Sequence, residues 1–492
     1  MRSLPGYIGA RDNGNMRTRL LAGLFAASLL LTLGAPACGG GGTGGEGGST
    51  TSSATTSSAT TTTGAGGEEQ RDGNDDFTTA EKLDVGASID AFLEPWSDQD
   101  FYVFQGSKGQ ALSFSIKAEE VPFDPRTIDT ALTLFDAAKT RIAENDQPVP
   151  QSSDDAQLFT ILPADGTYYL RVADCWTWSA DTSACTKPKV KLSTAYTLRV
   201  ADLSVAAPGV VADPEKGNGV AAATAVTYAE APAKGTRPLA VVYGRFDAAD
   251  DVDVYSFDIP ADLVTVAPGA RLVGTEWLLR EGPDGDGATT PVGKVYITTQ
   301  ADPSTRLAQI DGRDFGGYGA RLWPPLDSAG KYYLFIEHPS APLGANDFYI
   351  DLHGANSSRP LEQKELENDA AATPEPLVAV DDGSFYIEGD LGNAAADVDH
   401  FSFDVAGSAG KSVTASCISE RAGSGLLGFE VDLIDAATLT PLSIVKETPQ
   451  TNAYTMAVPV PAGASTMILK LSAAAQDPAV SGTFYRCGVH FQ

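Results

Sequence analysis

The sequence predicts an all-β protein of three tandem β-sandwich domains. Composition is the first indication, because 50 glycines and 30 prolines among 492 residues suit short strands and turns better than long helices. A second indication is an acidic opening to an aromatic strand, which occurs at 98–104 (DQDFYVF), 251–257 (DVDVYSF) and 397–403 (DVDHFSF). These copies are spaced by about one domain length, and a chain of this size holds about three domains.

The first 38 residues have the pattern of a bacterial signal peptide. A second start at Met16 leads through arginines into an apolar run at 20–33, which is too short to span a bilayer comfortably. The small residues before Cys38 resemble the lipobox of bacterial lipoproteins, although Ala35 stands where that motif usually has leucine. We expect Cys38 to be lipidated; the alternative is ordinary signal-peptidase cleavage that leaves it as a free thiol.

Residues 39–71 are rich in glycine, serine and threonine, and this composition predicts a disordered tether. A lipidated cysteine followed by a tether holds folded domains at a bilayer surface. We therefore expect an extracytoplasmic protein, anchored to the bacterial outer membrane or the cell surface.

The expected sandwiches cover 72–204, 212–354 and 364–492. Each copy begins with an asparagine, continues into the acidic motif and ends with a late strand that a small or glycine-rich turn precedes. The asparagines are Asn74, Asn218 and Asn368, and the late strands are PADGTYYLRV at 163–172, DSAGKYYLFIE at 327–337 and PAGASTMILKL at 461–471. Because order and spacing are shared, duplication explains the pattern better than chance.

Alternation along the motif strands predicts which side is buried. Tyr255, Phe257 and Ile259 share one face of their strand, and the third copy repeats this with Phe401 and Phe403. Sheets with one apolar face each must cover one another, which predicts sandwiches.

The two aspartates of each motif receive different expectations. Asp100, Asp253 and Asp399 lie in the inward-facing register, where we expect them to accept hydrogen bonds from backbone N–H groups of the preceding turn. The aspartates two residues earlier either complete an Asx turn or join the asparagine segment to bind a hard cation through oxygen; they are Asp98, Asp251 and Asp397.

In these motifs the chain resembles the bacterial pre-peptidase C-terminal domain. The strand at 163–172 and the segments 131–147 and 429–442 match its late strand and its middle hairpin, whereas TEWLLREGPDGDG from 275 departs from it. The resemblance extends from Asn74 to the C-terminus and implies a jelly-roll-like sandwich. Related modules of secreted collagenases bind collagen and take calcium near the entry segment, which implies a calcium site at Asn74, Asp76 and Asp98; no other cofactor is expected.

Four cysteines remain after Cys38, in a compartment that permits disulfides. Three pairings exist, and we favour those within a module, Cys175 with Cys185 and Cys417 with Cys487. A zinc site is the alternative, but no Cys-x-x-Cys or paired histidine spacing supports it.

Charge and motifs argue against several functions. The excess of 64 acidic over 34 basic residues argues against nucleic acid as a partner. No hydrolase signature includes His338, His353, His400 or His490. We expect His400 and Ser402 on the solvent face with Asp399 opposite, so that the three form no relay.

The loop from Cys175 to Cys185 carries the best candidates for binding. Trp176 and Trp178 either present an aromatic platform to a sugar or an apolar side chain, or fold back over the sandwich edge.

The predicted function is therefore that of a non-enzymatic, lipid-anchored cell-surface protein. Its modules bind extracellular protein or polysaccharide, or serve as structural spacers. The alternatives are a calcium-stabilised structural module without a ligand, and accessory domains of a secreted hydrolase system with an unrecognised active site.

Overall fold

The structure is a computed structural model. It describes residues 73–118, 127–146, 154–178, 194–213, 219–229, 239–261, 272–277, 287–288, 292–311, 321–322, 324–326, 328–339, 342–344, 346–357, 368–380, 383–392, 397–448, 453–455 and 457–492. The predicted signal peptide and tether lie outside these residues.

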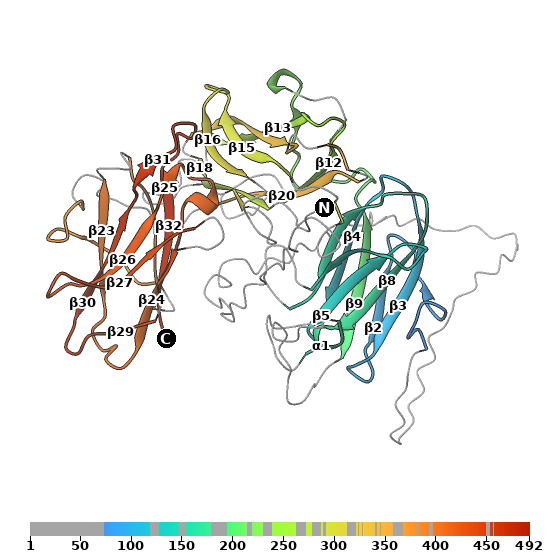
Figure 1. Ribbon diagram of the computed structural model, residues 1–492, viewed down its shortest axis with the longest axis horizontal. Helices are drawn as coiled ribbons and strands as arrows, with labels where there is room; N and C mark the ends of the chain where they lie inside the picture. The colour runs from blue at the N-terminus through green and yellow to red at the C-terminus, as the bar shows by residue number, and fades with distance from the viewer. Residues whose placement is uncertain are drawn as a thin grey trace, which may run out of the picture.

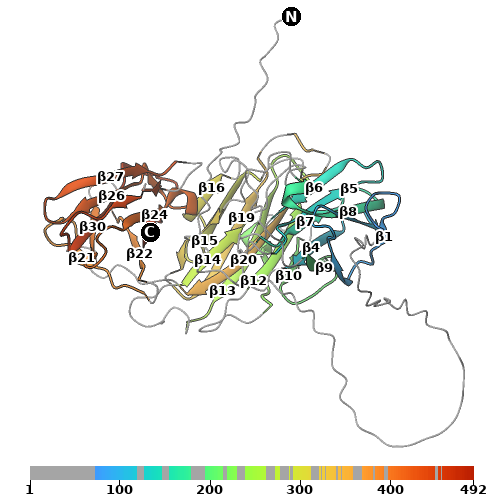
Figure 2. The same ribbon diagram turned by 90° about the horizontal axis from the view of Figure 1, so that it is seen from below.

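The described chain folds into three two-layer β-sandwiches in sequence order (Figure 1). This confirms the all-β expectation. The second sandwich, green to yellow in Figure 1, lies between the first and the third, and the view from below shows the same order (Figure 2).

The first sandwich pairs a five-stranded sheet, β1-β3-β8-β5-β6, with a four-stranded sheet, β2-β9-β4-β7. One short helix, α1 (Cys175–Trp178), follows β8. The strands are β1 (Glu81–Lys82), β2 (Ser88–Phe92), β3 (Gln99–Gly106), β4 (Ala111–Lys117), β5 (Thr130–Phe135), β6 (Arg141–Asn145), β7 (Gln157–Ile161), β8 (Gly166–Asp174) and β9 (Ala195–Asp202).

The second sandwich pairs β11-β13-β19-β15-β16 with β10-β12-β20-β14-β17, where β18 also pairs with β14. Its elements are β10 (Val210–Ala212), η3 (Val220–Ala222), β11 (Thr224–Ala225), β12 (Leu239–Arg245), β13 (Val252–Ile259), β14 (Leu272–Trp277), β15 (Lys294–Thr299), β16 (Arg306–Asp311), β17 (Arg321–Leu322), β18 (Pro325–Leu326), β19 (Gly330–Glu337) and β20 (Phe348–Ser357). Strands β10 and β20 extend slightly beyond the predicted range 212–354, and the exact domain limits stay a prediction.

The third sandwich pairs β21-β23-β30-β26-β27 with β22-β32-β24-β28, where β29 also pairs with β24. A two-stranded sheet, β25-β31, is added. The elements are β21 (Glu375–Pro376), β22 (Phe385–Asp390), β23 (Val398–Asp404), β24 (Ser412–Ile418), η5 (Glu420–Ala422), β25 (Leu426–Leu427), β26 (Glu430–Asp435), β27 (Thr440–Lys446), β28 (Ala453–Tyr454), β29 (Val458–Pro459), β30 (Thr466–Ser472), β31 (Ala475–Gln476) and β32 (Phe484–Phe491).

The three five-stranded sheets share one register. Each begins with a short parallel pair, β1 with β3, β11 with β13 and β21 with β23, and the other pairs are antiparallel. In the first sandwich, Glu81 pairs with Tyr102, Tyr102 with Leu170, Leu170 with Leu134 and Leu134 with Ala143. The corresponding rows are Thr224-Tyr255-Leu334-Ile297-Ala308 and Glu375-Phe401-Leu469-Leu433-Ser443.

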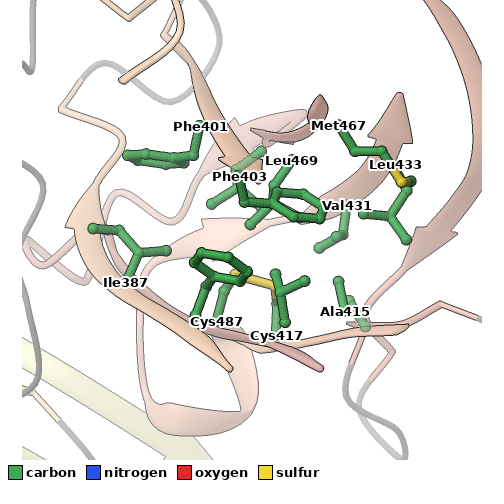
Figure 3. Packing of buried hydrophobic residues seen from close by; sticks show 14 of the residues in the cluster. Ile387, Phe401, Phe403, Ala415, Cys417, Val431, Leu433, Met467, Leu469 and Cys487 are labelled. Carbon is green, nitrogen blue, oxygen red and sulfur yellow. A yellow bond between two sulfur atoms is a disulfide. The ribbon is translucent and has the colours of Figure 1, made fainter. Parts of the chain in front are cut away.

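Each sandwich buries the aromatic face that the alternation predicts. Tyr102, Tyr255, Phe257, Phe401 and Phe403 are each no more than 1 % exposed. In the third sandwich, Phe401 and Phe403 belong to the same core cluster as the two cysteines of the disulfide (Figure 3). Burial of such rings is the main stabilising term of a sandwich.

Apolar contacts also join neighbouring sandwiches. Ala111, Phe159, Ile161 and Leu203 of the first sandwich form one buried cluster with Val241, Ala288, Phe348 and Ile350 of the second. Ile418, Ala422 and Phe484 of the third belong to the core cluster of the second. The three sandwiches therefore pack as one array.

No described helix has both the length and the apolar character needed to cross a membrane.

Candidate functional site

The acidic motif occupies the same place in all three sandwiches, at the start of β3, β13 and β23. The first aspartate of each motif holds a backbone turn. Asp98 accepts the N–H of Gln99 at 2.8 Å, Asp251 accepts that of Asp247 at 2.7 Å and Asp397 accepts that of Gly392 at 2.7 Å. A turn role is one of the two alternatives that the sequence predicts for these aspartates.

The second aspartate instead bonds a tyrosine in the opposite sheet. Asp399 accepts the hydroxyl of Tyr485 at 2.6 Å, and Asp100 accepts that of Tyr196. Asp253 and Tyr349 form the equivalent side-chain bond. The sequence predicts backbone N–H partners for these aspartates, whereas the bonds described here join them to phenol side chains. The inward register carries each carboxylate into the core. There, a phenol on the last strand reaches the carboxylate across the sandwich.

A second hydroxyl extends this bond in two sandwiches. Tyr102 and Tyr196 share a hydrogen bond of 2.8 Å, and Tyr255 and Tyr349 share one of 2.5 Å. In the third sandwich Phe401 replaces the first tyrosine and contacts the ring of Tyr485, with centroids 6.5 Å apart. Burial raises the pKa of Tyr196, Tyr255 and Tyr349 well above the ordinary value, so these phenols stay neutral donors.

The tyrosines were missed at the sequence level, although a signal exists. Tyr196, Tyr349 and Tyr485 each occupy the second position of the last strand, in AYTLRV, FYIDLH and FYRCGV. Aligning these strands by their place in each repeat would have shown the shared tyrosine. Its partner is about 90 residues earlier in sequence, and only the packing of the two sheets brings them together.

The second sandwich adds another carboxylate to this arrangement. Burial raises the pKa of Asp253 to about 8, and the negative charge of Asp213 contributes next. Two carboxylates so close cannot both ionise without cost. Burial and the neighbouring charge therefore both favour a proton on this pair of carboxyl groups.

The third sandwich gathers three carboxylates. One oxygen from each of Asp369, Asp397 and Asp399 lies within 4.8 Å of the others, and the group runs from the surface to the core. Asn368, which precedes this group, is fully buried, and its carbonyl accepts the His400 N–H at 3.0 Å. Carboxylate oxygens are the donors that calcium prefers, so this donor set fits a hard cation.

The residues predicted to bind calcium in the first sandwich are placed differently from the three carboxylates of the third. Asn74 is buried and Asp76 is exposed. The Asp76 carboxylate accepts the Thr78 N–H and hydroxyl, both at 2.6 Å, and these bonds lower its pKa. Asp76 thus closes its own turn, and a calcium site at Asn74, Asp76 and Asp98 stays a prediction.

The four histidines are buried, at 3 %, 0 %, 6 % and 7 % exposure for His338, His353, His400 and His490. His338 contacts Asp347 at 3.3 Å, and His490 contacts the Ser384 hydroxyl at 2.8 Å. The pKa of His353 is lowered to about 4 by burial.

His400 corrects one expectation, because we predicted it on the solvent face. Its ring is buried and lies 3.1 Å from the Asn368 carbonyl oxygen. The entry segment covers this outer face of β23, which strand alternation alone does not reveal. Burial lowers the pKa of His400.

The tryptophan loop is described only in part. Trp176 and Trp178 lie in α1 and are partly buried. The Trp178 indole N–H donates to Glu144 at 3.1 Å, which favours folding back over the sandwich; the binding platform stays a prediction.

One cysteine pair is confirmed, since Cys417 and Cys487 form a disulfide. Cys38 and Cys185 lie outside the described residues, so lipidation and the Cys175–Cys185 bond stay predictions.

Comparison with known proteins gives one family match. Residues 98–174 match the model of the bacterial pre-peptidase C-terminal domain. No curated protein matches the sequence.

Several solved structures match this chain at low similarity. Tandem CBM51 modules of a family 98 glycoside hydrolase from Streptococcus pneumoniae are 9 % identical over 48 % of this chain and 80 % of theirs, with a TM-score of 0.16. The CUB1-EGF-CUB2 domain of human MASP-1/3 is 9 % identical over 52 % and 99 %, with a TM-score of 0.16. The M60 catalytic domain with two CBM51 domains from Clostridium perfringens ZmpB is 8 % identical over 80 % and 55 %, with a TM-score of 0.18. Values this low carry no argument about function.

The family match begins at the first aspartate of the motif and ends with β8, so it includes the carboxylate and the central strands described above. Residues 98–174 of the first sandwich are thus similar to the bacterial pre-peptidase C-terminal domain.

Proposed function

We propose that this protein is a non-enzymatic, lipid-anchored scaffold of the bacterial cell surface. Its sandwiches hold binding surfaces for extracellular protein or polysaccharide at fixed spacing. The observation that carries the proposal is the packing between sandwiches. Phe348 and Phe484 are each 1 % exposed at the two junctions, so the modules form an array rather than freely jointed beads.

The N-terminal sequence supports the location. A signal pattern, Cys38 and a tether rich in glycine, serine and threonine are the parts needed to hold such an array outside the cytoplasm.

The anchor is tested by metabolic labelling with a palmitate analogue in cells that produce the full chain. The wild type should incorporate the label and a Cys38→Ser variant should not. Protease added to intact cells should then degrade the wild-type protein, as expected for a surface location. An unlabelled wild-type protein released into the medium would refute the anchor.

The scaffold is tested separately by binding. The soluble chain should bind isolated envelope polysaccharide or surface protein, with no turnover of hydrolase substrates. Catalytic turnover by the purified chain would instead favour the accessory-hydrolase alternative.

The carboxylates of Asp369, Asp397 and Asp399 favour one second candidate, a calcium-stabilised third sandwich. A cation bound only by the folded state raises stability by mass action. Calcium should raise the melting temperature relative to chelator, and Asp397→Asn should remove the difference, because the amide keeps an oxygen for the Gly392 N–H but loses the charge. Asp477→Asn, in an exposed turn, is the matched control. Equal melting with calcium and with chelator would exclude this candidate.

A further inference from the structure

The hairpin β26–β27 of the third sandwich has an exposed apolar surface. Leu439, Leu442 and Ile444 are 51 %, 37 % and 55 % exposed. Strand β27 is the edge of its sheet, and proteins normally protect such edges. The equivalent hairpins of the other two sandwiches contact the following sandwich, and their contacts indicate the kind of partner that this surface fits.

All three hairpins carry the same β-bulge. The register shifts between Leu134 and Phe135 in the first, between Ile297 and Thr298 in the second, and between Leu433 and Ile434 in the third. The extra residues that face these shifts are Ile142, Leu307 and Leu442. We call β5–β6, β15–β16 and β26–β27 the junction hairpins.

In the first two sandwiches, the bulge contacts a glycine of the following sandwich. A Cβ on Gly287 would lie 3.1 Å from the carbonyl oxygen of Ile142 and 3.2 Å from its Cγ2. Gly482 donates its N–H to the carbonyl of Leu307 at 3.1 Å, and a Cβ there would collide with that carbonyl.

The second junction adds further bonds to the hairpin edge. Gln309 donates its N–H to the Gly423 carbonyl at 2.8 Å, and Ser481 donates its N–H to the Arg306 carbonyl at 2.8 Å. By the shared register, Ile444 holds the place of Gln309, and Leu442 holds that of Leu307.

Each following sandwich also supplies a phenylalanine from the first position of its last strand. Phe348 pairs with Arg245 and Phe484 with Asp390, so the two are equivalent. Both are buried against the preceding sandwich. We call them the junction phenylalanines.

We infer that the β26–β27 hairpin is a docking site for a β-sandwich module of another protein, one that presents a glycine beside an aromatic residue at the start of its last strand. The interface would continue the two already present in the chain, with the same bulge as the contact point. This deepens the proposed scaffold function by naming the class of partner and its site.

A second copy of this chain is not suited to the role. Its two junction phenylalanines are already buried, and the equivalent residue of the first sandwich is Ala195, which pairs with Phe92 and is exposed. The first sandwich thus has a small residue where the other two have a junction phenylalanine, whereas the third sandwich has an apolar, exposed hairpin. Head-to-tail packing of sandwiches can continue at such a hairpin.

The test uses the soluble full chain, from residue 39, with a second copy of residues 358–492 appended after Gln492. The appended copy brings its own linker and junction phenylalanine. Lys446→Arg in the copy alone marks its hairpin peptide by mass, and arginine keeps the pair with Glu430. Hydrogen exchange then compares the resident and the appended hairpins within one molecule.

The resident hairpin should exchange at least several-fold more slowly than the appended one, because only the former is covered. Phe484→Ala in the appended copy should abolish the difference. Equal exchange rates in the two hairpins, with the core strands of the appended copy protected, would overturn the inference.

Sedimentation of the chain without the appended copy tests whether a second copy of this chain binds the hairpin. We expect a monomer; a dimer that Ile444→Lys abolishes would show that a second copy covers the hairpin and would overturn the partner assignment. Neither measurement depends on Cys38, so failure here is distinguishable from failure of the proposed anchor.

Discussion

At the scale of single residues, a buried carboxylate bonded to a phenol recurs in all three cores. Asp100, Asp253 and Asp399 are 0 %, 1 % and 0 % exposed, and a buried charge or polar group is costly unless it is hydrogen-bonded. The cross-sheet phenol supplies that bond. The bond also helps to set the position of one sheet relative to the other, because it links the motif strand to the last strand.

Tyr485→Phe should lower the free energy of unfolding of the third sandwich by about 1–3 kcal/mol, because the change removes the hydrogen of a buried bond to Asp399 and leaves the ring in place. Urea unfolding of the purified chain measures this effect. Tyr454→Phe, half-buried in β28 of the same sandwich, should cost less. An equal loss for both variants would contradict the importance of the cross-sheet bond.

The pair of carboxylates in the second sandwich predicts a dependence on pH. Asp253 has a pKa of about 8 in the folded chain against an ordinary 3.8, so between these values the folded state holds a proton that the unfolded state has lost. Stability should therefore fall as pH rises from about 4 to about 8, and level off above that.

Asp253→Asn mimics the protonated carboxyl and should flatten this dependence. The measurement is the urea midpoint of the second sandwich at about pH 5 and about pH 9. The midpoint of the variant, relative to that of the wild type, should be higher at about pH 9 than at about pH 5. Asp258→Asn, at the exposed position of the same strand, is the control. A variant that is destabilised equally at both pH values would show that Asp253 is ionised in the fold.

At the scale of elements, the disulfide of the third sandwich bridges two neighbouring strands. Cys417 of β24 and Cys487 of β32 are direct partners in the ladder, and both side chains join the core (Figure 3). The bond closes a loop between residues 70 apart in sequence. Such a crosslink restricts the unfolded chain.

Replacing both cysteines by alanine should destabilise the third sandwich by roughly 2–5 kcal/mol. Thermal unfolding with and without reductant measures the change, since reduction of the wild type should reproduce most of it and the double variant should not respond to reductant. A wild type that melts at the same temperature after complete reduction would contradict the prediction.

At the scale of the whole molecule, glycines allow the sandwiches to approach closely. Gly482 lies against the Leu307 carbonyl, and the Gly423 carbonyl accepts the Gln309 N–H at 2.8 Å, so the loops that form the second junction are packed backbone to backbone. A side chain at Gly482 would push the third sandwich away from the second without entering either core.

Gly482→Ala should therefore loosen the second junction, which small-angle scattering would detect as a larger radius of gyration with unchanged β-sheet content. Gly219→Ala is the matched control, because a Cβ there meets nothing within 4 Å. Identical scattering from Gly482→Ala and the wild type would show that this contact does not hold the array together.

Much of the fold was predictable because local patterns carry it. Alternation in 251–259 and 397–405 placed Phe257 and Phe403 inside, since side chains on a strand alternate with a period of two. The repeated motif indicated three modules, and the position of the cysteines favoured the Cys417–Cys487 bond. Each of these inferences needs only neighbouring residues or a repeat along the chain.

The sequence by itself therefore determined the all-β class and the repeated sandwiches, and it left a turn role and a cation site as the two alternatives for Asp98, Asp251 and Asp397. Only the tertiary structure decided the tyrosine partners of the second aspartates, the burial of His400 and the contacts between sandwiches. These depend on how separate sheets and loops face one another. A strand pattern fixes which side of each strand is apolar, but the group that covers that side comes from distant parts of the chain.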